Sequence, residues 1–134
     1  MMTTDILNFT IIVRTQDEAL QFYVEKLGFE KRMDIPMGNG NRWVTIAPRD
    51  AKVTFTLQPL DWFEGKEREE RATRIGQSPT IVLQVDNCQQ TYDQLSQHGV
   101  EFTEIPTQTS YDIEATLADL YGNTLVLLEQ STTH

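Results

Sequence analysis

Residues 7–29 read LNFTIIVRTQDEALQFYVEKLGF and predict one strand followed by one helix. Leu7–Val13 is a short apolar run rich in β-branched residues, which is typical of a strand. Thr15 stands where a helix N-cap belongs, with acidic residues in the first turn behind it. Apolar residues then recur at helical spacing from about Gln16 to Leu27, and Gly28 supplies the left-handed residue that ends a helix.

The rest of the chain continues and then repeats this pattern. Three more strands are predicted in the first half, at about Phe29–Asp34, Arg42–Ala47 and Lys52–Gln58. The second half repeats the order about 72 residues downstream. Its predicted elements are a strand at Thr80–Val85, a helix at about Cys88–Gln97, and strands at about Tyr111–Ala118 and Thr124–Glu129. Gly99 ends the helix, and Val100-Glu101-Phe102 follow it much as Phe29-Glu30 follow Gly28. A repeat of this length indicates a duplicated unit.

The sequence therefore predicts an α+β fold of two βαβββ repeats. They would form a curved, half-open, eight-stranded mixed sheet with the helices outside. We expect a single domain over 1–134, with repeat one at about 5–58 and repeat two at about 79–130. The linker at about 59–78 would hold a short helix around Glu64–Thr73. The concave face opposite the helices is a usual place for a small-molecule pocket.

Composition excludes several classes of partner. The formal net charge of −9 argues against a nucleic-acid surface, which needs clustered Lys and Arg. The dense charge run at 66–71 mixes signs, as a solvated helix face does. No apolar run approaches the roughly 20 residues of a membrane span, and the N-terminal residues lack a signal-peptide pattern. With Cys88 as the only cysteine, we expect a cytoplasmic protein without disulfides.

Three stretches of this sequence resemble a known family. They are residues 13–29, residues 85–100 and the turn Asp119–Asn123. Their order and spacing resemble the glyoxalase, bleomycin-resistance and extradiol-dioxygenase superfamily, also called vicinal oxygen chelate proteins. The turn departs from the family pattern, because Leu120 and Tyr121 replace a Pro and an Asp.

The resemblance implies four positions that hold metal ligands in metal-using members. Carried over by motif, they fall on the residues Asn8, Thr56, Thr80 and Val126. None of these side chains is an imidazole or a carboxylate, and Thr54 and Gln58 beside Thr56 are no better. His98 is expected to complement a helix end, and His134 is the last residue. The sequence therefore predicts neither a metal nor a cofactor.

Other side chains are candidates for a ligand site on the concave face. Strand alternation places Thr10 beside Asn8, and hairpin folding places Glu114 and Thr116 beside Val126. Glu114 could bind a cation or act as a general base, or it could be an ordinary exposed carboxylate. Trp62-Phe63 could cover the pocket or pin the linker to the core, and Tyr111 is a further aromatic candidate.

Trp43 and Cys88 are weaker candidates. Trp43 lies in mid-strand and is typical of a core or a dimer interface rather than of a ligand platform. Cys88 has no basic partner in its neighbourhood of the sequence, so nothing there favours a reactive thiol.

Two classes of function follow from these observations. The first is a non-catalytic binder of a small, partly aromatic or cationic molecule, as the bleomycin-resistance branch implies. The alternative is a lyase, isomerase or dioxygenase-type enzyme, either metal-free and using Glu114 or with carboxylate ligands that the motif does not reveal. The resemblance also implies a homodimer, since unpaired strand edges favour pairing.

Overall fold

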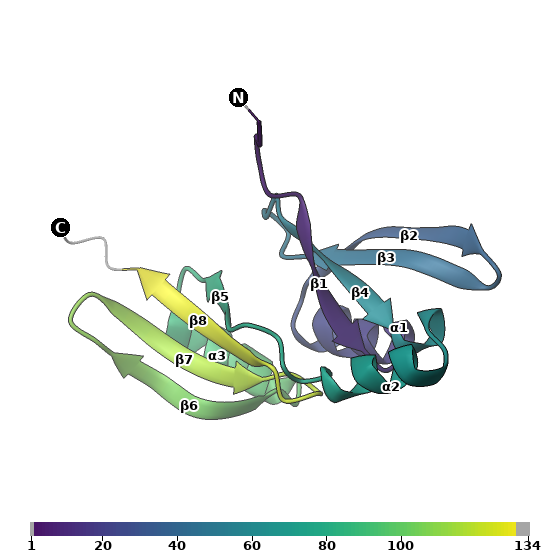
Figure 1. The fold of residues 1–134 in the computed structure, drawn as a ribbon. Helices are drawn as coiled ribbons and strands as arrows, with labels where there is room; N and C mark the ends of the chain where they lie inside the picture. Colours follow the sequence, from purple (N-terminus) through teal and green to yellow (C-terminus); the bar gives the residue numbers. More distant parts are fainter. Residues whose placement is uncertain (1, 131–134) are drawn as a thin grey trace. The chain divides into compact units, whose positions relative to one another are not determined.

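The computed structural model describes residues 2–130, which divide into two compact units between Ile75 and Gly76 (Figure 1). The first unit contains β1 (Asn8–Val13), α1 (Gln16–Leu20), η1 (Gln21–Lys26), β2 (Glu30–Gly38), β3 (Asn41–Ala47), β4 (Thr54–Pro59), η2 (Leu60–Trp62) and α2 (Gly65–Thr73). The second contains β5 (Ile81–Gln84), α3 (Cys88–Gln97), β6 (Glu101–Gln108), β7 (Asp112–Ala118) and β8 (Thr124–Gln130). The α+β class and the βαβββ order of both repeats are confirmed.

Each repeat builds one four-stranded mixed sheet. The strand order is β1-β4-β3-β2 in the first and β5-β8-β7-β6 in the second. In both, the first strand runs parallel to the last, and the other neighbours are antiparallel. The first and last strands of a repeat are thus brought side by side, although more than 40 residues separate Asn8 from Thr54.

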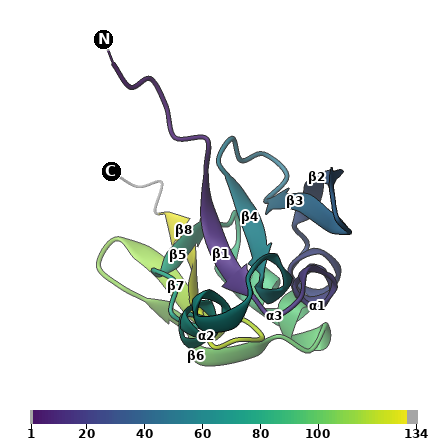
Figure 2. The same ribbon diagram turned by 45° about the vertical axis from the view of Figure 1, so that its right-hand side comes forward.

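In the first unit, the helix formed by α1 and η1 packs against the sheet (Figure 2). Ile11, Val13, Phe55 and Leu57 are all buried. Tyr23 is completely buried, and its ring centroid lies 5.5 Å from that of Phe29. Burial of these side chains is the main apolar contribution to the stability of this unit.

The first helix begins as predicted but changes its winding. The hydroxyl of Thr15 accepts a hydrogen bond from the N–H of Glu18 at 3.1 Å, which caps the helix. From Gln21 onward the helix is of the π type, with the Leu27 N–H donating to Phe22 O at 2.9 Å. The wider turn accommodates two consecutive core side chains, Phe22 and Tyr23.

β2 is longer than predicted and runs to Gly38 rather than Asp34, and β6 has a similar length and runs to Gln108. Each contains a proline, Pro36 or Pro106, and the pairing of each shows register shifts. Both are edge strands, where a residue without an N–H donor can face away from the sheet.

The second unit packs α3 against β6, β7 and β8. Asn87 caps this helix, its side-chain oxygen accepting from the Gln90 N–H at 2.9 Å. Leu95 of the helix is buried, as are Leu117, Leu125 and Leu127 of the sheet. Alternation along the strands therefore places partly or fully exposed side chains, both aliphatic and polar, on the other face of this sheet.

The turn between β7 and β8 is held by buried polar groups. Asp119 Oδ1 accepts from the backbone N–H groups of Tyr121 and Asn123, each at 2.8 Å. Asn123 Nδ2 donates to Asp119 Oδ2 at 2.8 Å, and Asn123 Oδ1 accepts from the Ser78 N–H at 2.9 Å. The Asp and Asn of this turn thus anchor the chain segment that leads into β5.

Candidate functional site

The sheet face opposite α1 carries the site residues that were expected in the first repeat. The parallel register pairs Asn8 with Thr54 and Thr10 with Thr56. Asn8 Nδ2 donates a hydrogen bond to Thr56 Oγ1 at 3.1 Å. Asn8 and Thr10 are exposed, whereas Thr56 is only 1% exposed. The structure therefore brings Asn8, Thr10 and Thr56 together on one face.

Thr45 is a neighbour on this face that sequence reasoning missed. It pairs with Thr56 across β3 and β4, so both side chains point to the same side of the sheet. Thr45 is 2% exposed, and its hydroxyl has no hydrogen-bond partner among residues 2–130. Strand alternation alone would have placed Thr45 on the same face as Trp43. The pairing of Thr45 with Thr56, however, depends on the register of β3 against β4.

The corresponding face of the second repeat carries a different set. Val82 pairs with Val126 along the parallel strands, and Thr80 lies just before β5 and is exposed. Across β7 and β8, Thr116 pairs with Val126, and Glu114 pairs with Leu128. Glu114 is half-buried and lies among aliphatic and hydroxyl side chains on this face.

The two aromatic candidates have separate environments. Trp62, in η2, stacks on Trp43 with ring centroids 6.0 Å apart and an interplanar angle of 11°. This contact connects the beginning of the linker to β3. Tyr111 lies in the connection between β6 and β7 and is 74% exposed. The structure therefore gives Trp62 an aromatic partner and leaves Tyr111 on a surface turn.

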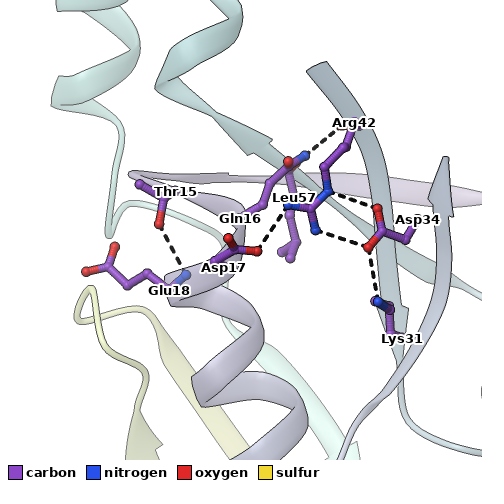
Figure 3. A network of polar contacts seen from close by, with 8 residues as sticks. All are labelled: Thr15, Gln16, Asp17, Glu18, Lys31, Asp34, Arg42 and Leu57. Atoms are coloured by element: carbon purple, nitrogen blue, oxygen red, sulfur yellow. Dashed lines mark hydrogen bonds and ion pairs between the residues drawn. The ribbon is translucent and has the colours of Figure 1, made fainter. Parts of the chain in front are cut away.

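A polar network centred on Arg42 joins the β2–β3 hairpin to the first helix (Figure 3). Arg42 Nε and Nη2 donate to the two carboxylate oxygens of Asp34 at 2.9 and 3.0 Å, and Nη1 donates to Asp17 Oδ1 at 3.1 Å. The hydrogen bonds from Arg42, followed by that from Lys31, lower the pKa of Asp34 to about 2. The hydrogen bonds that Arg42 donates to Asp34 and, to a smaller extent, to Asp17 raise the pKa of Arg42.

Gln16 links the same region to the core of the first unit through side-chain hydrogen bonds. Its Nε2 donates to the backbone oxygen of Arg42 at 2.8 Å and to that of Leu57 at 3.1 Å. The side chain is nearly buried, so both carbonyl groups gain a partner that water could not easily supply. No local sequence pattern indicates this network, because its members come from α1, β2, β3 and β4.

A small cavity of about 140 Å³ opens beside this network. Its lining residues are Thr15, Gln16, Asp17, Gly40, Asn41, Arg42, Pro59, Asp61 and Trp62. All of them belong to the first unit. Of the expected site residues, Trp62 lines this cavity.

Cys88 is placed as a structural residue. It is completely buried at the start of α3, and its backbone N–H donates to Glu129 Oε1 at 2.8 Å. Burial raises the pKa of its thiol, and the charges of Glu129 and Glu114 raise it further. A thiol with these surroundings stays protonated and is a poor nucleophile.

Potential metal ligands are dispersed over the described residues. Within residues 2–130, no three His, Cys, Asp or Glu side chains come together as a group that could hold a metal ion. His98 forms the C-cap of α3, and His134 lies outside the described residues. Of the helices in this part of the chain, none has the length and apolarity needed to span a membrane.

Comparison with known proteins gives consistent matches along most of the chain. The family model described as Glyoxalase/Bleomycin resistance protein/Dioxygenase superfamily matches residues 5–127. The uncharacterized protein YurT of Bacillus subtilis (strain 168) is 36% identical over 123 residues, covering 90% of this chain and 95% of YurT.

Two solved structures extend the comparison. The crystal structure of UcmS2 has a TM-score of 0.82 and 33% identity, covering 95% of this chain and 98% of its own. That of TnmS3, described as an antibiotic binding protein from Streptomyces sp. CB03234, has a TM-score of 0.79 and 27% identity, covering 98% and 99%.

Proposed function

The chain belongs to the glyoxalase/bleomycin resistance protein/dioxygenase superfamily, and from this premise we propose that it binds a small organic molecule without catalysing its conversion. The observation that carries the proposal is the pair Asn8 and Thr56. At two positions where the family resemblance implies metal ligands, an amide donates to a hydroxyl at 3.1 Å. Neither group is a ligand that a divalent transition metal favours, but both are suited to hydrogen-bonding a neutral molecule.

Relatives support binding as the activity. TnmS3, which is described as an antibiotic binding protein, shares this fold at a TM-score of 0.79 over nearly the whole chain. One scaffold can host several functions, so the fold likeness supports the proposal only together with the site residues. The likeness to TnmS3 and the side chains of Asn8 and Thr56 both favour a small molecule as the partner of this chain.

The side chains beside the candidate residues favour a mostly apolar ligand. On β2, Met33 and Ile35 pair with Thr45 and Trp43, which places them on the same sheet face. Met33 and Ile35 are 42% and 46% exposed. Exposed aliphatic groups next to a few hydroxyl and amide groups are typical of sites that bind flat, weakly polar molecules.

Glu114 is the observation that favours the alternative, an enzyme. The β7–β8 register places this carboxylate on the face opposite α3, next to Thr116 and Val126. A half-buried carboxylate in such a position could act as a general base. In a pure binder, the same group would only recognise a cationic or hydrogen-bond-donating part of the ligand.

The test begins with calorimetric titration of aromatic metabolites and antibiotics, selected by thermal shift, with Zn²⁺ and Mn²⁺ titrated separately. We expect one or more organic compounds to bind and to be recovered unchanged after prolonged incubation. Asn8→Ala should weaken the best compound by about ten-fold, the loss that one hydrogen bond to a bound ligand produces. Glu69→Gln, on the exposed face of α2, should leave its affinity unchanged.

Three results would contradict the proposal. Turnover of the bound compound that Glu114→Gln abolishes would establish the enzyme instead. Stoichiometric metal binding that depends on Asn8 or Thr56 would show that the inherited position still holds an ion. Equal loss of affinity in Asn8→Ala and Glu69→Gln would place the ligand elsewhere.

A further inference from the structure

The cavity of about 140 Å³ in the first unit is a candidate for a second binding site. It lies where β1 and β4 end and where β3 begins, and neither Asn8 nor Thr56 lines it. Pockets for drug-sized ligands usually measure about 300–1,000 Å³. The space in this cavity therefore suits a compact group with a few heavy atoms rather than a whole antibiotic.

The charge that borders the cavity excludes an anionic ligand. Arg42 is its one basic lining residue, and all three guanidinium nitrogens of Arg42 already donate to the carboxylates of Asp34 and Asp17. A phosphate or carboxylate would have to displace one of these hydrogen-bonded pairs. It would also meet the negative charge of Asp61.

Two carboxylates of the lining have unused acceptor capacity. Asp17 binds Arg42 through Oδ1 alone, and its side chain is 80% exposed. Asp61 has one long contact, from Oδ1 to Arg68 Nη1 at 3.4 Å, and its side chain is 69% exposed. Within the described residues, Oδ2 of each carboxylate has no hydrogen-bond partner. Both oxygens can accept hydrogen bonds from a cation.

Trp62 supplies the remaining part of the site. Its indole is held by the stack on Trp43, yet the residue is still partly exposed and lines the cavity. A ring fixed in this way attracts a cation placed over its face, and a planar cation can also stack on it. We propose that this cavity binds a planar organic cation, a guanidinium or amidinium group, between Trp62 and the carboxylates of Asp17 and Asp61.

The test compares two probes of the same shape. Benzamidinium is planar and positively charged, whereas benzamide is its neutral counterpart. We expect benzamidinium to change the Trp fluorescence saturably with a dissociation constant in the millimolar range, and benzamide to bind at least about ten-fold more weakly. Added NaCl should weaken the binding of benzamidinium, since the carboxylates are exposed and screened.

Matched variants locate the probe. Asp61→Asn should weaken benzamidinium by about three- to ten-fold, because one exposed charge contributes modestly to binding. Asp50→Asn removes the same charge from an exposed turn that does not line the cavity, and it should leave the affinity unchanged. Trp62→Leu also removes the fluorescent reporter, so its binding is measured by ligand-observed NMR, where saturable binding should be abolished. Circular dichroism would show whether that variant keeps its fold.

Several outcomes would overturn the proposal. They are the absence of saturable binding by benzamidinium, equal binding of benzamide, and equal effects of Asp61→Asn and Asp50→Asn. The probe is titrated with no other ligand present. The result is therefore independent of the proposed small-molecule site on the sheet faces, and either proposal can fail alone.

Discussion

Gly76, which precedes β5, lies in close contact with the β7–β8 turn. Its φ angle is +81°, and a Cβ atom added there would lie 2.3 Å from the backbone oxygen of Tyr121. We predict that Gly76→Ala lowers the free energy of unfolding by about 3 kcal/mol, since a left-handed backbone cost adds to a clash with fixed main-chain atoms. Urea denaturation followed by circular dichroism would measure the loss.

Gly122 offers the matched control for that substitution. It has a φ of +89°, but an added Cβ would meet nothing within 4 Å. Gly122→Ala should therefore cost only about 1 kcal/mol, the conformational part of the penalty. Equal losses at the two positions would show that the approach of Gly76 to Tyr121 contributes nothing.

Thr45 provides a second prediction at the level of single residues. Its buried hydroxyl lacks a partner among residues 2–130, so Thr45→Val removes an unsatisfied polar group and keeps the side-chain shape. We expect the free energy of unfolding of the unliganded protein to rise by about 1 kcal/mol. Differential scanning calorimetry or urea unfolding would detect this as an increase in Tm or in midpoint.

Thr56 on the neighbouring strand should respond in the opposite direction. Its hydroxyl accepts from Asn8 Nδ2, so Thr56→Val should lower the free energy of unfolding by about 0.5–1 kcal/mol. If Thr45→Val is as destabilising as Thr56→Val, the Thr45 hydroxyl has a hydrogen-bond partner after all.

At the level of elements, the Arg42 network ties the β2–β3 hairpin to the first helix (Figure 3). The pKa of Asp34 is about 2 in the folded protein, below the ordinary value of 3.8, chiefly because Arg42 donates to it. A depressed folded-state pKa contributes stability above pH 4 and loses it as the pH falls toward 2. Solvent screening of this partly exposed pair limits the effect to on the order of 1 kcal/mol.

The measurement compares the wild-type protein with Asp34→Asn by urea unfolding between pH 2 and pH 6. We expect the variant to be less stable at pH 6 and the difference to vanish near pH 2. Asp50→Asn is the control, because Asp50 is 93% exposed and lies 3.8 Å from its arginine partner. A stability difference that stays constant over this pH range would show that the charge of Asp34 is not what stabilises the hairpin.

For the whole molecule, we predict a homodimer. β2 has a hydrogen-bonded neighbour on one side only among the described strands. It also exposes Met33, Ile35 and Met37, which are 42%, 46% and 48% accessible. Unpaired edges and exposed apolar groups are both relieved by association with a second copy. Sedimentation equilibrium at micromolar concentration should therefore give twice the 15.4 kDa mass of the chain.

Two substitutions distinguish the contact surface of this dimer. Met37→Lys, at a position of β2 that is not among the ligand-site residues, should shift the protein toward the monomer, because a charge on an edge strand opposes pairing. Ile105→Lys, at a 65% exposed position on the edge strand β6, should leave the dimer intact, since β6 exposes a single large apolar residue. A wild-type protein that sediments as a monomer contradicts the prediction.

Sequence reasoning predicted the elements of this chain well where the signals are local. The Thr15 cap, the ends of both helices and the duplicated strand order follow from neighbouring residues, and the structure has them. The predicted end of β2 at Asp34 was wrong, because Pro36 is unfavourable within a strand by local rules but is tolerated at an edge. The π-type winding from Gln21 was missed, since it reflects how two adjacent aromatic side chains fit the core.

The sequence alone was sufficient for the fold and the family, because a duplicated pattern of apolar periodicity, caps and glycines survives without any long-range information. The family model and the strand order agree with that prediction. The candidate sites needed the folded chain. The hydroxyl of Thr45, the stack of Trp43 on Trp62 and the network of Arg42 join residues from separate elements. Strand register and side-chain packing create these contacts, and no stretch of neighbouring residues encodes them.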